Sequence, residues 1–255
     1  MKVSIITVTY NSARFLEDCI QSVISQTYSD LEYIIIDGKS KDATVSIIKK
    51  YESKISKWVS EPDRGMYDAL NKGIQMATGD VIGLLNSDDM LASPDVVQII
   101  ADTFLEKKID STFGDLAYVE QINTNKIVRF WKGNTYKRYR FMYGWMPAHP
   151  TFYVKKSAIE QWGGYETHYY TAADYEFMAR LLFNHRVSSY YIPKLIVKMR
   201  VGGASNITLK ARLRANRRDF LAMKRNKIPF PFIVSFLKPT IKLHQFFRSI
   251  YKKYL

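Results

Sequence analysis

Two adjacent carboxylates, Asp88 and Asp89, directly follow a short apolar run over residues 81–85. Such a run predicts a buried strand, and two ionised carboxylates at its end repel each other and lose hydration. A positive partner would offset both effects: a helix N-terminus, a basic side chain or a bound cation. The chemistry expected at this position therefore depends on which of these lies beside the pair.

Polar side chains also follow the neighbouring predicted strands. Because the carboxyl ends of parallel strands meet at one edge of a sheet, where ligands bind, these side chains are expected to converge. For an isolated Asp-Asp pair a solvated turn is the simpler interpretation, but Ser93 is expected to cap the next helix, so the pair has no capping role. A divalent cation is then favoured, and oxygen ligands favour Mg²⁺ or Mn²⁺, with substrate phosphates completing the shell. The converging residues are Thr9 to Asn11, Asp37, residues 61–64 and residues 86–89.

Several other chemistries lack their sequence signals. There is no GxxxxGK[ST] loop, and the turn TYNSARF after the first strand has no glycine, so a P-loop and a dinucleotide fingerprint are both disfavoured. The four histidines have no zinc-site spacing, and no Ser/His/Asp or Cys/His set is evident. The single cysteine, Cys19, excludes a disulfide within the chain and suits a reducing compartment.

The elements that position these residues alternate between strands and helices. Apolar β-branched runs predict strands over residues 3–11, 33–38, 55–60 and 81–85, and helical periodicity follows at residues 15–24, 45–51 and 66–77. Ser93, Pro94 and Asp95 look like the start of another helix. Alternation of this kind with continuous apolar strands predicts a mostly parallel sheet covered by helices on both faces, an α/β fold.

The charge divides the chain into two parts. Residues 206–255 contain 13 Lys and Arg against the single acid Asp219, a net charge of +12 out of the total of +14. We therefore expect a near-neutral domain over residues 1–205 and a basic helical extension over residues 206–255. The N-terminus is not a convincing signal peptide, and no run of about 18 apolar residues predicts a membrane span.

Four blocks in order, VSIITVTYNSARFLEDCIQSV, EYIIIDGKSKDAT, SEPDRGMYDALNKGIQMATGD and LLNSDD, resemble family 2 glycosyltransferases of the GT-A fold. The resemblance covers about residues 1–200 and is greatest to bacterial enzymes that assemble O-antigen, capsule and other surface polysaccharides. It implies a Rossmann-like sheet, a nucleotide-sugar donor that is usually UDP-linked, a divalent metal (Mn²⁺ or Mg²⁺) and inversion at the anomeric carbon.

The resemblance also implies roles for the residues at the sheet edge. Asp37 would accept a hydrogen bond from the uracil ring, and Asp89 would ligate the metal that bridges the diphosphate. Asp88 would help to hold the ribose or the metal. The family often has Asp where this chain has Asn86, so a third acidic contact is not assumed. The remaining donor contacts would be Thr9, Tyr10 and Asn11 at the base and ribose, and Arg64 at the diphosphate, with a solvated turn cation as the alternative for Arg64.

On the acceptor side the resemblance points to Asp174 as the catalytic base. Relatives have Glu-Asp at this place, whereas this chain has Ala173-Asp174, and Glu176 lies two residues further along as a weaker substitute. The Gly163-Gly164 turn would shape the acceptor side. His149 is interpreted as structural. Among the aromatic residues Trp145, Trp162, Tyr169 and Tyr170, at most one or two are expected to stack on sugar rings.

The basic extension has its own pattern. Leu243, Phe247, Ile250 and Tyr254 form one stripe beside Lys and Arg side chains, which is typical of helices that lie on anionic membranes. The resemblance implies a lipid-linked glycan acceptor, which would lie there, at the inner, cytoplasmic face of a bacterial membrane. The alternative is a basic helix packed on the core.

Two other functions remain open at this point. A pI of about 9.6 suggests nucleic-acid binding, but the charge is confined to the extension and no recognition motif is present, so no nucleic-acid partner is expected. A sugar-nucleotide nucleotidyltransferase would normally have a glycine-rich loop after the first strand, which TYNSARF lacks.

Overall fold

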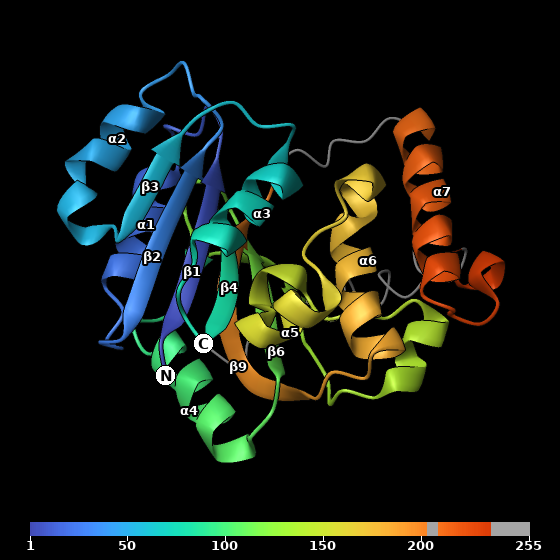
Figure 1. Ribbon diagram of the computed structural model, residues 1–255. Coiled ribbons are helices and arrows are strands. Elements are labelled where there is room, and N and C mark those ends of the chain that lie inside the picture. Colours follow the sequence, from blue (N-terminus) through green and yellow to red (C-terminus); the bar gives the residue numbers. More distant parts are fainter. Residues whose placement is uncertain (203–208, 236–255) are drawn as a thin grey trace.

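A computed structural model describes residues 1–202 and 209–235 of the 255-residue chain. Its first half is a parallel sheet in which the sequence-predicted strands pair side by side (Figure 1). The pairing is in register, so that Thr9 lies opposite Asp37 and Asp37 opposite Ser60. The four strands are β1 (Val3–Thr9), β2 (Leu31–Asp37), β3 (Lys57–Ser60) and β4 (Val81–Asn86).

Further strands extend the sheet beyond β4 and make it mixed. The order is β3-β2-β1-β4-β8-β6-β9-β5, with β7 paired to β6. Strand β8 is antiparallel to β4 and β6, whereas β6 and β9 are parallel. The α/β fold with a Rossmann-like parallel half is therefore confirmed, and the parallel pattern gives way to a mixed one after β4. These strands are β5 (Met90–Leu91), β6 (Ser111–Val119), β7 (Ile127–Trp131), β8 (Tyr153–Lys155) and β9 (Ser189–Arg200).

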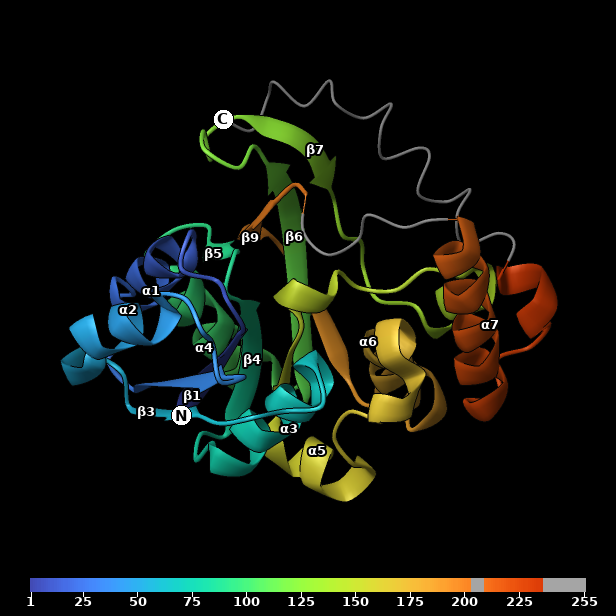
Figure 2. The same ribbon diagram turned by 90° about the horizontal axis from the view of Figure 1, so that it is seen from above.

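Helices cover both faces of the sheet, as Figure 2 shows from above. Side chains of β1 alternate between two cores: Ile5 packs with α1, α2 and α4, and Ile6 packs with α3, α5 and α6. Because both faces of the sheet are buried, the strands are continuous apolar runs in the sequence. The α-helices are α1 (Leu16–Ile24), α2 (Thr44–Lys50), α3 (Met66–Met76), α4 (Val96–Lys107), α5 (Lys156–Trp162), α6 (Ala173–Met178) and α7 (Leu209–Arg225).

Shorter helical segments complete the described chain: η1 (Glu52–Lys54), η2 (Arg138–Tyr143), η3 (His149–Thr151), η4 (Thr167–Ala172) and the π-helical turn η5 (Ala179–Asn184). The expected cap at Ser93 is wrong. Asp95 is the N-cap residue of α4 and makes no side-chain cap, while the Ser93 hydroxyl donates to the Asp95 carboxylate. The acidic pair still has no capping role, because α4 begins seven residues after Asp89.

The first helix of the basic extension packs on the rest of the protein. Helix α7 contacts α6 and η4, and it lies beside α6 in Figure 1. Ala222, Met223 and Asn226 are buried there. For this part of the extension the core-packing alternative is correct, whereas the aromatic stripe between Leu243 and Tyr254 lies outside the described residues. In the part of the chain that the structure describes, no helix is both long and apolar enough to cross a bilayer.

Candidate active site

The carboxyl edge of the parallel strands gathers the predicted donor-binding residues. Thr9, Asp37 and Ser60 end adjacent strands in register, about 4.8 Å from strand to strand. Asp37 is fully buried and accepts hydrogen bonds from the Ser60 hydroxyl at 2.6 Å and the Ser40 backbone N–H at 3.0 Å. The carboxylate is thus held in one orientation. Sequence reasoning missed Ser40 and Ser60, although the position of Ser60 at the end of the third strand was a signal.

The loop after β1 lies against the loop after β2. The Asn11 backbone N–H donates to the Ser40 hydroxyl at 2.8 Å, and the Asn11 side-chain oxygen accepts from the Lys41 N–H at 2.8 Å. This arrangement holds Asn11 at a positive φ of 49°, a conformation that Asn tolerates well. Tyr10 remains 60% exposed, and the buried Thr9 hydroxyl has no hydrogen-bond partner within residues 1–202 and 209–235. Tyr10 is therefore accessible to a ligand, whereas the Thr9 hydroxyl is unpaired but enclosed.

Asp63, within the predicted range 61–64, and Gly38, which the sequence analysis did not single out, complete this side. A Cβ on Gly38 would lie 2.5 Å from Asp63 Oδ2 and 3.3 Å from the Tyr10 ring. A side chain at this position would therefore have to displace the Asp63 carboxylate from the end of β2. Arg64 next to it is 87% exposed and pairs with Asp68 at 3.0 Å, as a solvated turn cation would.

The acidic pair lies in a tight turn after β4. The Asp89 N–H donates to the Asn86 carbonyl at 3.0 Å, and the Asn86 amide donates to Asp89 Oδ2 at 2.9 Å. Asp89 is fully buried, and its Oδ1 has no partner among the described residues. Burial first, and then the charge of Asp88, raises the pKa of Asp89 to about 8, against the opposing effects of Asn86 and Arg200. Burial also raises the pKa of Asp88.

Arg200, at the end of β9, holds this turn from behind. Its guanidinium donates to the Asp88 carbonyl at 2.9 Å and to the Gln121 carbonyl at 2.9 Å through Nε, and it pairs with Asp18. It lies 4.6 Å from the centre of the Phe15 ring and is nearly fully buried. Arg200 was not a sequence candidate, because it is separated from Asp88 by 112 residues.

Two carboxylates fit a site for Mg²⁺ or Mn²⁺, in which water and substrate phosphates supply the other oxygens. The buried, unpartnered Asp89 Oδ1 is the observation that points to a cation, because an isolated buried carboxylate oxygen is costly. No group of three or more His, Cys, Asp or Glu side chains that could hold a metal occurs among the residues the structure describes. The protein would thus supply only part of the coordination shell.

Asp174 lies in the first turn of α6 and is half-buried. Its Oδ1 accepts the N–H of Tyr175 at 2.6 Å. Burial is the main reason why the pKa values of Tyr67 on α3 and of Tyr165 are raised. The charge of Asp174 raises both further, so both rings lie within its electrostatic reach. Helix α3 directly follows the loop containing Asp63, and Asp174 therefore lies on the side of the protein that adjoins the strand edge.

Glu176, the alternative base, is engaged in the interior. It is fully buried and pairs with Arg180 at 3.0 Å, and the Asn226 amide donates to it at 3.2 Å. Arg180 also donates to the carbonyls of Trp162, Gly163 and Gly164. The pair therefore fixes the Gly163-Gly164 turn, and of the two carboxylates Asp174 is the more exposed.

The structure sorts the candidate aromatic residues and His149. Trp145 packs against Phe113 and Phe141, Trp162 stacks on His185 with 3.6 Å between ring centres, and Tyr169 is buried. Tyr170 is 59% exposed. His149 is within hydrogen-bond distance of the Tyr165 hydroxyl at 2.7 Å, which supports a structural role.

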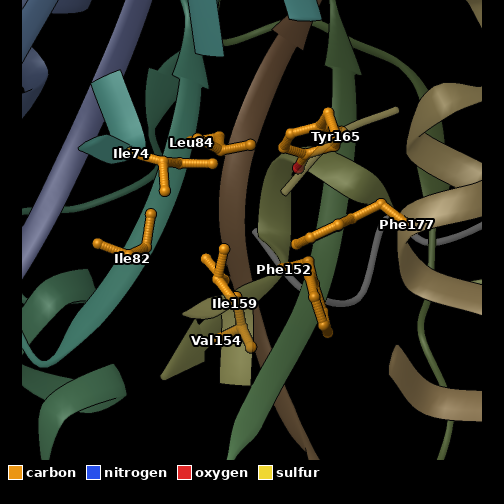
Figure 3. Close-up of a pocket in the computed structure, with 8 residues that line it drawn as sticks. All are labelled: Ile74, Ile82, Leu84, Phe152, Val154, Ile159, Tyr165 and Phe177. Carbon is orange, nitrogen blue, oxygen red and sulfur yellow. The ribbon is translucent and has the colours of Figure 1, made fainter. Parts of the chain in front are cut away.

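A small pocket lies in the core beneath these residues (Figure 3). Tyr165, Phe177 and Phe152 contribute aromatic rings to it, and the rest of the lining comes from aliphatic side chains. It contains no charged group that could meet a diphosphate, so it is distinct from the strand edge. The lining residues are Ile74, Ile82, Leu84, Phe152, Val154, Ile159, Tyr165 and Phe177.

The fold is similar to that of GT-A glycosyltransferases, and comparisons with known proteins give the family. The family model "Glycosyl transferase family 2" matches residues 4–162, and the chain belongs to this family. An uncharacterized glycosyltransferase of Mycobacterium tuberculosis is 32% identical over 181 residues, which are 70% of this chain and 68% of that protein. A PGL/p-HBAD biosynthesis glycosyltransferase of Mycobacterium bovis is 28% identical over 207 residues, or 80% and 78%.

Solved structures show the same fold at low identity. S. aureus TarS has a TM-score of 0.67 at 17% identity, over 88% of this chain and 39% of the TarS chain. The mannosyltransferase PcManGT from Pyrobaculum calidifontis, in complex with GDP-Man and Mn²⁺, has a TM-score of 0.67 at 17% identity, over 96% of this chain and 70% of that chain. TarS residues 1–349 have also been solved in complex with UDP-GlcNAc.

Proposed function

We propose that this family 2 glycosyltransferase moves a sugar from a UDP-linked donor to a hydroxyl of a growing, lipid-linked surface glycan. The observation that carries the donor half is the strand edge, where a fixed Asp37 lies near the turn of Asp88 and Asp89. The complexes of TarS with UDP-GlcNAc and of PcManGT with GDP-Man support a nucleotide sugar as the ligand class.

The donor would bind across the ends of the parallel strands. Asp37, oriented by Ser60, would accept the uracil N–H, because a carboxylate is a strong acceptor for such a donor. The Thr9 hydroxyl and the exposed Tyr10 would line the base and ribose, and Asn11 would fix the loop that carries them. Arg64 could leave its exposed pair with Asp68 to reach the diphosphate, since such pairs contribute about 1 kcal/mol or less.

Asp89, with Asp88, would hold a divalent cation. The metal would stabilise the charge that develops on the leaving diphosphate. Asp89 points a buried, unpartnered oxygen at this position, and Arg200 holds the turn so that the pair stays in place. The Mn²⁺ bound to PcManGT supports the ion class.

Asp174 would act as the general base. It would take the proton from the acceptor hydroxyl as that oxygen attacks the anomeric carbon from the face opposite the leaving diphosphate. A single displacement of this kind inverts the anomeric centre and needs no covalent nucleophile. General-base catalysis typically contributes about 10²- to 10⁴-fold.

The two-part organisation is part of the proposal. Residues 1–205 would form the catalytic domain, and the +12 charge of residues 206–255 would bind an anionic membrane where a lipid-linked acceptor lies. Helix α7 joins the two parts, since it belongs to the extension and packs on α6 of the catalytic domain. The protein would then work at the cytoplasmic face of a bacterial membrane as a peripheral enzyme.

The test is calorimetry against a panel of nucleotide sugars, with and without Mn²⁺, followed by product analysis. Free UDP and a new glycoside are expected with a lipid-linked acceptor. Release of pyrophosphate would instead identify a nucleotidyltransferase. Salt-dependent binding to RNA or DNA without any nucleotide-sugar binding would identify a nucleic-acid-binding protein.

A further inference from the structure

Tyr170 combines high exposure with a strained backbone. Its φ of 48° and ψ of −120° form a break inside η4, and its side chain is 59% exposed. Side chains with a Cβ rarely adopt this conformation, which costs about 1–3 kcal/mol, whereas glycine adopts it freely. An exposed tyrosine gains little from burial at such a position. Strain of this kind is concentrated at binding and catalytic sites.

One face of the Tyr170 ring is supported by the basic extension. The Arg218 guanidinium on α7 lies 4.3 Å from the ring centre, which fixes the ring by a cation–π contact. Helix α7 packs directly on η4 and α6. The charge of Asp219, the next residue of α7, also reaches Tyr67 and Tyr175, beside Asp174. The extension therefore approaches the same side of the protein as the proposed base.

The chain itself keeps Tyr170 close to Asp174. They are four positions apart in the sequence, so their Cα atoms are at most about 14 Å apart even in a fully extended chain. An acceptor of one or two sugar rings spans such a distance. Of the four aromatic candidates, Trp145, Trp162 and Tyr169 are engaged in packing, and Tyr170 offers an accessible ring.

We propose that Tyr170, backed by Arg218, is a stacking platform for a pyranose ring of the acceptor, and that α7 is thereby part of the acceptor site. This inference rests on the proposed glycosyltransfer. The C–H groups of a sugar face carry partial positive charge and suit the negative face of an aromatic ring. Because Arg218 holds the ring before the acceptor arrives, less side-chain entropy is lost on binding.

Substitutions at Tyr170 separate this role from packing. Tyr170→Ala should raise the Kd for acceptor glycosides tenfold or more, which corresponds to about 1.4 kcal/mol, and Tyr170→Phe should stay near wild type because it keeps the ring. Tyr170→Gly should lose acceptor binding like Tyr170→Ala but melt at a higher temperature than Tyr170→Ala, because glycine relieves the strained φ. Nucleotide-sugar affinity should be unchanged in all three.

Tyr190→Ala is the matched control. Tyr190 is also an exposed tyrosine beneath a cation, since Lys107 lies 5.6 Å from its ring centre. It lies near the start of β9, whereas Arg200, which contacts the turn of Asp88, is ten residues further along at the other end of this strand. This substitution should leave the Kd for acceptor glycosides unchanged. The probes are octyl glycosides of glucose, galactose, mannose and N-acetylglucosamine, with binding followed by saturation-transfer NMR in the presence of UDP and Mn²⁺.

Three results would overturn the proposal: wild-type binding by Tyr170→Ala, an equal loss in Tyr190→Ala, or no binding of any glycoside to the wild-type protein. Donor calorimetry on the wild-type protein is independent of these results. If the protein binds glycosides through Tyr170 but binds no nucleotide sugar, the proposed function fails and the Tyr170 site stands.

Discussion

Replacing Glu176 by Gln tests whether the buried carboxylate is structural and Asp174 is the base. Glu176 is fully buried and pairs with Arg180, which is itself only 7% exposed. Gln keeps the size of the side chain but removes the charge, so the guanidinium remains buried without its counter-ion. The Glu176→Gln protein should therefore be less stable while its chemistry remains intact.

The structure sets the expected magnitude. Removing one partner of a buried ion pair costs about 3–5 kcal/mol. Arg180 keeps the carbonyls of Trp162, Gly163 and Gly164 as acceptors, so the lower end, about 3 kcal/mol, is appropriate. For a protein of this size about 1 kcal/mol changes Tm by about 2–4 °C, so a fall of about 6–12 °C is expected.

Asp174→Asn is the contrasting variant. Asn can still accept the Tyr175 N–H, and loss of the charge in the first turn of α6 costs less than about 1 kcal/mol, so Tm should fall by at most about 4 °C. Sugar transfer should fall by at least about 10²-fold. Calorimetric melting and initial rates, measured well below both Tm values, give the two readouts.

The reasoning is refuted if Glu176→Gln melts like wild type but has no transferase activity, because the base would then be Glu176. Normal activity in Asp174→Asn would refute the assignment of Asp174. Loss of both stability and activity in Asp174→Asn would show that this carboxylate is structural too.

Three further predictions follow from other parts of the structure. UDP affinity of the wild-type protein should fall when EDTA replaces Mn²⁺, and Asp89→Ala should remove this difference; equal wild-type affinities in calorimetry would contradict the metal site. Burial alone would raise the pKa of Glu32, but hydrogen bonds from Ser4, Thr78 and Lys57 outweigh it and lower the pKa from 4.5 to about 2. Its stabilising contribution is therefore full above about pH 4.5 and lost toward pH 2, so urea unfolding should show Glu32→Gln less stable than wild type at pH 7 and closer to it at pH 3; a constant gap would exclude this carboxylate as the cause. Removal of residues 240–255 should weaken sedimentation with anionic liposomes, at about 1 kcal/mol per basic residue lost, and leave UDP binding intact; a full-length protein that ignores such liposomes at low salt would rule out membrane attachment.

The first half of the fold was predictable because its signals are local. The four strands and the helices between them follow from periodicity within short windows, and their observed bounds lie close to the predicted ones. The start of α4 was misplaced, since Ser93, Pro94 and Asp95 form a loop in which Ser93 bonds to Asp95 rather than to the helix. The partners of β8 and β9 were beyond these signals, because strand partners are chosen by contacts far apart in the chain.

The sequence by itself determined which polar residues end the parallel strands, and so brought Thr9, Asp37 and Asp89 to one edge. Parallel strands in a sheet must end on the same side, whatever the rest of the chain does. Only the tertiary structure decided what surrounds these residues. Arg200 reaches Asp88 from 112 residues away, and burial with Arg180 distinguishes Glu176 from Asp174 two positions earlier. Such pairings depend on how distant elements pack, and no pattern of neighbouring residues records them.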